Sequence, residues 1–161
     1  MPTCASRIVA ALLAALAWVA AVAAEPGTIV SYPAAGRFED VRDDLKLAIE
    51  GRGLVVDYQS YVGRMLERTG KDLGATRKVY ADAQAFVFCS AALSRKAMEA
   101  DPANAALCPY SIVVYALAGS PQKVFVAYQR TARRDGSPAS KAALAEVDAM
   151  LDAIAREAAG R

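Results

Sequence analysis

Apolar residues in this chain change their spacing several times, and this alternation limits the fold more than any single motif does. Short apolar runs typical of strands occupy residues 28–32, 54–58 and 85–89. Between them, over 38–52 and 90–100, apolar residues recur every three or four positions, as on one face of a helix. Interleaved strands and helices predict a two-layer α+β domain. The run at 85–89 is apolar on both faces, which is typical of an interior strand.

The clearest strands, 111–117 and 124–128, are joined by the turn-forming residues 118–123 and predict a hairpin. Residues 61–80 are harder to assign. They predict one or two short helices broken by Gly70 and Gly74.

The C-terminal tail predicts an amphipathic helix. Ser137 followed by Pro138 is a helix-start signature. An apolar stripe at three- and four-residue spacing follows it, formed by Leu144, Val147, Met150, Leu151 and Ile154. We therefore divide the chain into segment 1–24, an α+β domain over 25–130, and a helical tail over 131–161. The tail helix packs either on this domain or on a partner, and in the second case the chain forms a homodimer.

The first 24 residues have the layout of a secretory signal peptide. Arg7 precedes an uncharged apolar run, Ile8–Ala24, which ends in the small residues suited to a signal peptidase. The alternative is an uncleaved membrane anchor, although the run is a little short of the roughly 20 residues that a span needs. We expect export, to the periplasm, with cleavage near Ala24. Contact with a membrane is expected only through an uncleaved leader.

Composition excludes several classes of function. The chain contains no histidine, so a Ser-His-Asp triad, a His-ligated zinc site and an imidazole proton shuttle are excluded. The net charge of +2 gives no reason to expect nucleic acid as a partner. No catalytic motif is recognisable, and the missing histidine argues against an enzyme without excluding one.

Two cysteines, Cys89 and Cys108, follow the leader, and three interpretations stay open. They form a structural disulfide in an oxidising compartment, or a reversible dithiol, or they bind a soft ion such as Cu(I) with Met98 or Met65 as a thioether ligand. If the intervening helix joined neighbouring parallel strands, the two sulfurs would lie at opposite ends of the sheet, too far apart to bond.

Two segments together resemble a known bacterial family. They are F-C-S-A-A-L-S-R-K-A-M-E-A-D-P (88–102) and L-C-P-Y-S-I-V-V-Y (107–115). They are similar to the family of domain of unknown function 302, whose members carry a cysteine at a helix start, an acidic-Pro helix end, and Leu-Pro-Cys before a strand. M-L-E-R-T-G-K-D-L-G (65–74) is similar to an exported branch of this family. The resemblance covers about 38–128 and leaves the tail helix outside.

Residue by residue, Cys89 matches the first family cysteine, Pro102 the helix-ending proline, Pro109 the proline of Leu-Pro-Cys, and Tyr115 the strand tyrosine. One departure is informative. Tyr110 occupies the place of the second family cysteine, and Cys108 stands two positions earlier. In an extended segment a shift of two keeps a side chain on the same face.

The resemblance implies helices over a mainly antiparallel sheet, and it implies that Cys89 and Cys108 are neighbours. It supplies no established reaction. We therefore expect an exported, small binding or interaction module whose ligand the sequence does not name, with no cofactor. The alternative is a periplasmic thiol-redox or Cu(I)-binding protein that uses Cys89 and Cys108, with Met98 as an additional copper ligand.

Overall fold

The strand-like runs of the sequence form one five-stranded antiparallel sheet in the order β1-β5-β4-β3-β2. The computed structural model describes residues 28–161. The strands are β1 (Ile29–Ala34), β2 (Val56–Ser60), β3 (Tyr80–Phe88), β4 (Tyr110–Leu117) and β5 (Ser120–Gln129). The helices are α2 (Phe38–Glu50), α3 (Val62–Asp72), α4 (Ala91–Ala100), the 3-10 helix η2 (Pro102–Leu107) and α5 (Pro138–Ala158). The predicted α+β architecture is confirmed.

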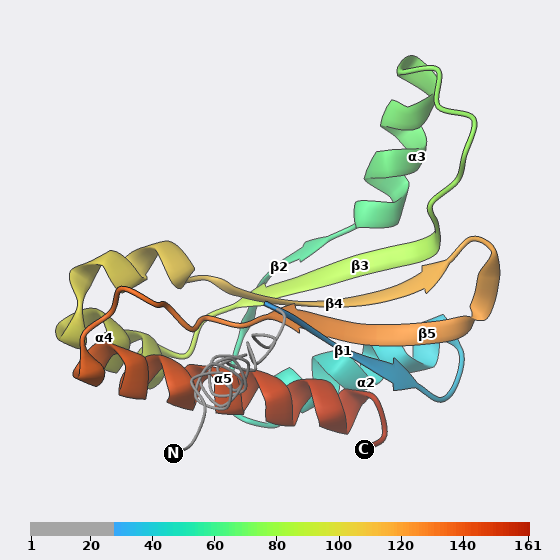
Figure 1. The fold of residues 1–161 in the computed structure, drawn as a ribbon. Helices are drawn as coiled ribbons and strands as arrows, with labels where there is room; N and C mark the ends of the chain where they lie inside the picture. The colour runs from blue at the N-terminus through green and yellow to red at the C-terminus, as the bar shows by residue number, and fades with distance from the viewer. Residues whose placement is uncertain (1–27) are drawn as a thin grey trace, which may run out of the picture.

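Helices α2 and α5 lie side by side against one face of the sheet, and α4 lies beside the start of α5 (Figure 1). The predicted start of the tail helix is correct, because the Ser137 hydroxyl caps α5 by accepting from the backbone N–H of Ser140 at 3.1 Å. The apolar stripe of α5 faces the sheet, so the tail helix completes the domain's own hydrophobic layer.

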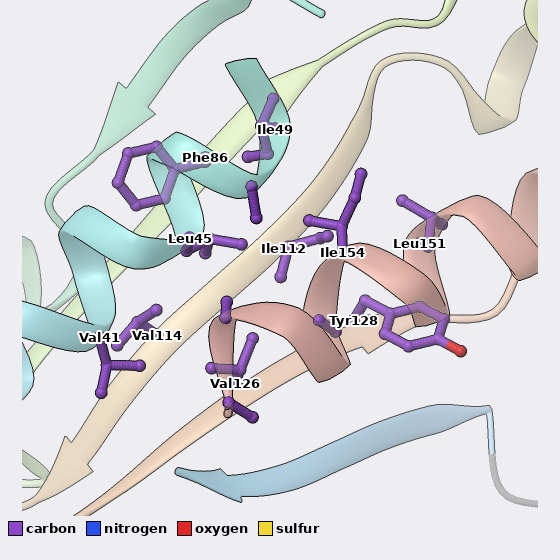
Figure 2. Packing of buried hydrophobic residues seen from close by; sticks show 14 of the residues in the cluster. Val41, Leu45, Ile49, Phe86, Ile112, Val114, Val126, Tyr128, Leu151 and Ile154 are labelled. Carbon is purple, nitrogen blue, oxygen red and sulfur yellow. The ribbon is translucent and has the colours of Figure 1, made fainter. Parts of the chain in front are cut away.

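The core lies between α2, α5 and this helix-covered face of the sheet (Figure 2). Leu45 from α2, Phe86 from β3, Ile112 from β4, Val126 from β5 and Ile154 from α5 are at most 1% exposed. The core side chains of β3, β4 and β5 occupy every second position, since only every second side chain of a strand points to the same face.

Several strand boundaries differ from the prediction: β2 lies two residues later than the run at 54–58, and β3 begins five residues before the run at 85–89. Strand β1 continues through Pro33, which an edge strand tolerates because it needs hydrogen bonds on one side only. The predicted loop at 118–123 is too long, because Ser120 already pairs with Leu117 and the turn is Ala118–Gly119. A register shift next to this turn leaves residues 121–123 outside the regular pairing.

Helix α3 corrects the prediction for residues 61–80. It is a single helix that runs through Gly70 without a break, because one glycine costs a helix only about 1 kcal/mol relative to alanine. It ends at Asp72, and Gly74 adopts a positive φ of 68° shortly after it. Helix α3 then rises away from the sheet on the side opposite α2 and α5 (Figure 1).

The predicted leader, residues 1–24, lies outside the described residues 28–161. Within that described range, none of the helices has the length and hydrophobicity that crossing a membrane requires.

Candidate functional site

The two cysteines lie next to each other at the end of the sheet where β3 ends and β4 begins. Cys89 follows the last residue of β3, and Cys108 follows η2 just before β4. Their Cα atoms are 6.5 Å apart and their sulfur atoms form a disulfide. Strands β3 and β4 are antiparallel neighbours, so α4 and η2 return the chain to the same end of the sheet. The parallel crossover that would have separated the sulfurs does not occur.

A buried hydroxyl pair lies next to this disulfide. The Ser94 hydroxyl on α4 lies 3.5 Å from the sulfur of Cys108 and 3.0 Å from the hydroxyl of Tyr110. Positions 108 and 110 therefore both reach Ser94, although the Cys108–Pro109 peptide bond between them is cis and the segment is not a regular strand at this point. The ring of Tyr110 packs edge-on against Phe88 at a centroid distance of 6.4 Å.

The other family-motif positions lie apart from the sulfurs. Pro102 is the first residue of η2, where the Asp101 carboxylate caps the helix by accepting from the N–H of Ala103 at 2.9 Å. Pro109 is exposed beside Tyr110. Tyr115 lies farther along β4, where its ring stacks on Phe125 at 5.2 Å.

The two methionines proposed as copper ligands are separated by the length of β3. Met98 is half-buried on α4, at the cysteine end of the sheet, whereas Met65 lies on α3, which adjoins the opposite end of β3 (Figure 1). Met65 as a partner of the cysteines is therefore wrong. Within residues 28–161, no cluster of three or more His, Cys, Asp or Glu side chains is placed to hold a metal ion.

A polar cluster that the sequence did not suggest ties η2 to α5. Asn104, 2% exposed, donates to the carbonyl of Ala97 at 2.8 Å and to the hydroxyl of Ser140 at 2.9 Å. Arg133 donates to the Asn104 side-chain oxygen at 2.9 Å and to the Asp101 carboxylate at 2.8 Å. Every member of this network has a partner, so the network stabilises the segment that carries Cys108.

A second polar cluster fixes α5 to the edge of the sheet. Asp152 accepts hydrogen bonds from the hydroxyls of Tyr32 and Tyr128 and from Arg156, the last at 2.7 Å. Burial raises the pKa of Asp152, but these three donors outweigh burial and hold the pKa below its ordinary value. Burial and the same carboxylate raise the pKa of Tyr128. The i, i+4 spacing of Asp152 and Arg156 was the one sequence signal for this cluster.

The face of the sheet opposite α2 and α5, which we call the open face, has an unusual composition. Register places the following residues on it, with Lys123 added by strand alternation alone: Ile29, Ser31, Pro33, Tyr58, Ser60, Tyr80, Ala83, Ala85, Val87, Ser111, Val113, Tyr115, Leu117, Lys123, Phe125, Ala127 and Gln129. Among them only Lys123 is charged. A solvated face of an antiparallel sheet normally alternates to polar residues, whereas this one carries an aromatic cluster of Tyr80, Tyr115 and Phe125.

Helix α3 and the returning segment 73–79 form an arm that stands on the open side of the sheet (Figure 1). None of the residues of α3 is buried, although it has apolar side chains. Leu73 is 82% exposed, and Met65 and Leu66 are also exposed. Gly63 allows the first turn of the arm to lie on β3, since a Cβ at this position would come within 2.8 Å of the backbone nitrogen of Ala83.

A cleft of about 340 Å³ lies between α3 and the returning segment. Its apolar lining includes Leu66, Leu73 and Val79, and Lys71 and Arg77 also line it. A cleft of this size lies in the lower range of volumes typical of ligand sites. The open face and the arm lie on the same side of the molecule, and both carry apolar side chains that are exposed or half-buried (Figure 1).

Comparisons with known proteins support the fold. The family model described as "Domain of unknown function DUF302" matches residues 30–158, so the match includes α5 as well as the segments that carry the sequence resemblance. The crystal structure of an uncharacterised conserved DUF302 protein from Bacillus stearothermophilus superimposes with a TM-score of 0.70 and 13% identity, covering 83% of this chain and 99% of that chain. At this identity the likeness concerns the fold alone. No protein of curated function matches the chain.

Proposed function

The chain belongs to the DUF302 family, a domain of unknown function, and we propose that this member is an exported interaction module that binds through its open face and arm. One observation carries the proposal: the central strands are apolar on both faces, yet α2 and α5 cover one face, whereas on the other only the first turn of α3 lies on β3. Soluble monomers rarely expose contiguous apolar patches larger than a few hundred Å².

The composition of the open face supports a protein interface. Interface cores are depleted of charged residues and enriched in aromatic ones. Tyr115 and Phe125 stack on the neighbouring strands β4 and β5, and Tyr80 packs edge-on against Tyr115 at 5.8 Å. Clustered aromatic side chains of this kind dominate the binding energy of many interfaces.

Export to the periplasm, after cleavage of the leader near Ala24, is part of the proposal. The support is the layout of residues 7–26 and the presence of a cysteine pair at bonding distance, which suits an oxidising compartment. Intact mass of the protein recovered from a periplasmic extract tests it. The mass expected is that of a chain starting at Glu25 with its two cysteines oxidised, whereas full-length protein retained in the cytoplasm would contradict export.

Site-specific photo-crosslinking in the producing cell tests the interaction surface. A benzophenone amino acid in place of Val113, at the centre of the open face, is compared with one in place of Leu47, which is 65% exposed on α2 outside the face. We expect an adduct of defined mass at position 113 that disappears when Phe125 is changed to Asp, and none at position 47. Equal labelling at both positions, or none at either, would show that the open face binds nothing.

A thiol-redox role is the second candidate, and the Ser94 hydroxyl beside Cys108 favours it, since this hydroxyl could stabilise a Cys108 thiolate. In such a role a partner dithiol would give two electrons and two protons to the Cys89–Cys108 disulfide and would itself become a disulfide. Alkylation and mass measurement over a graded series of dithiol reductants test it. Reduction at the potential of common thiol reductases would support exchange, whereas resistance would identify a structural clamp.

Binding of Cu(I) belongs to the same alternative, because only the reduced pair offers two thiolates, with Met98 nearby on α4 as the thioether. Titration of the reduced protein with Cu(I), beside a Cys89→Ser variant, tests it. Stoichiometric binding by the first and not the second would support a carrier, and failure of both to bind would remove it.

A further inference from the structure

We infer that the occupant of the open face is a second copy of this chain, so that two sheets pack face to face with each arm lying against the partner copy. This inference rests on the proposed interaction surface and names its partner. The size of the surface, its charge and the position of the arm each support it.

The open face is large enough for a dimer. Five strands spaced about 4.8 Å apart and central strands of eight to ten residues give a face with a projected area on the order of 600 Å². A stable interface buries about 800 Å² of accessible surface on each partner. Side-chain relief makes accessible area larger than projected area, and the arm adds a second contact wall.

The charge of the open face fits a copy of itself. In a twofold pair the same patch meets itself, so any charge on it approaches a like charge. Across the seventeen residues of the face the only charge is Lys123, which lies in residues 121–123, outside the regular pairing and toward the β4–β5 turn. Binding a strongly charged partner requires charges of the opposite sign on the face. A nearly uncharged aromatic face has none to offer, and it suits another nearly uncharged face.

The arm has the length that a second layer requires. An eleven-residue helix is about 16 Å long, and packed sheets lie about 10 Å apart. The arm rises on the open side, so it spans the thickness of a second sheet placed there (Figure 1). Its exposed apolar side chains, Met65, Leu66 and Leu73, then contact the partner copy, which explains why α3 buries none of its own residues.

Sedimentation equilibrium of the processed chain recovered from the periplasm tests the inference. We expect the mass of two chains at micromolar concentrations. Val113→Lys places two unpaired cations across the twofold and should weaken dimerisation by at least about 100-fold, since an uncompensated buried charge costs several kcal/mol. The matched control Leu47→Lys, on the helical side of the molecule, should remain a dimer.

A second variant guards against a folding defect. Leu66→Lys changes an exposed arm residue and should also weaken the dimer while leaving the circular dichroism spectrum and the urea midpoint of the monomer unchanged. A dimer that survives both Val113→Lys and Leu66→Lys uses another surface and overturns the inference.

The crosslinking experiment separates the two proposals. An adduct at position 113 with twice the chain mass supports a second copy. A monomer in sedimentation together with an adduct of a different mass overturns the second copy and keeps the interaction module. A monomer without any specific adduct overturns both.

Discussion

Asn104 offers the sharpest test of what holds the cysteine-bearing segment in place. Its side chain makes three hydrogen bonds, to the Ala97 carbonyl, the Ser140 hydroxyl and Arg133, and it is almost completely buried. Asn104→Ala removes all three at once. The cost depends on what each partner can do after the change.

The bond to Ser140 is the most costly to lose. The Ser140 hydroxyl is 0% exposed, so water cannot replace the Asn104 amide as its donor, and leaving it unpaired costs roughly 1–3 kcal/mol. The Ala97 carbonyl keeps its backbone bond from Asp101 at 3.1 Å, and Arg133 keeps the carboxylates of Asp101 and Asp135. These two lost bonds cost about 0.5 kcal/mol each. We therefore expect Asn104→Ala to lower the free energy of unfolding by about 3 kcal/mol.

Urea denaturation followed by circular dichroism measures this loss. With a slope of about 2 kcal/mol per molar, the midpoint should fall by roughly 1.5 M. Gln122→Ala, which removes an exposed amide, is the control and should change stability by less than about 0.5 kcal/mol. In a double-mutant cycle with Ser140→Ala the two losses should not add, because the bond is shared. A loss below about 1 kcal/mol for Asn104→Ala would refute the reasoning.

Three further predictions concern other parts of the molecule. Replacing both Cys89 and Cys108 with Ala should lower the free energy of unfolding, measured by urea denaturation, by about 3 kcal/mol, as loop closure over their separation of 19 residues predicts. An unchanged free energy of unfolding would show that the disulfide does not stabilise the fold. Asp152→Asn should lower the free energy of unfolding most near neutral pH. The pKa of the carboxyl is depressed in the folded state, so its contribution to stability is present above the unfolded pKa of about 3.9 and is lost as pH falls through the folded value. A difference in unfolding free energy that does not shrink in acid would contradict this. Gly63→Ala should displace the arm while leaving the core intact. Amide hydrogen exchange should then become faster in α3 and stay unchanged in β4. Unchanged exchange in α3 would show that the backbone near Ala83 accommodates the added methyl group.

Periodicity predicted the elements that the core holds. The stripe of α5 and the run of β4 were assigned correctly, because the same apolar side chains that set the pattern are buried against each other. The run at 85–89 identified only the second half of β3, which begins at Tyr80. The assignment was weaker where burial does not follow the pattern. Ala92, one of the apolar residues of the predicted helix 90–100, is exposed, and α3 has an amphipathic sequence with no buried face.

The polar clusters could not be found in the same way. Asn104 and Arg133 are 29 positions apart, and Tyr32 and Asp152 are 120 apart. Single polar residues have no period, so no local pattern indicates which distant partner satisfies them. The cysteine pair was foreseen only as one of several alternatives, because its proximity depends on β3 and β4 being antiparallel, which is a property of the sheet topology.

The two ends of β3 differ in how firmly they are held, and this difference bears on function. At the Phe88 end, the disulfide, the Ser94–Tyr110 hydroxyl pair and the Asn104 network hold the chain together. At the Tyr80 end, the arm contacts the body mainly through its first turn on β3. Segments that adapt to partners come from the least stable parts of a fold. A disulfide set within a satisfied polar network is suited to clamping, whereas the arm can move relative to the sheet without disturbing the core. The end of β3 farthest from the sulfurs is therefore the end better suited to the interaction that we propose.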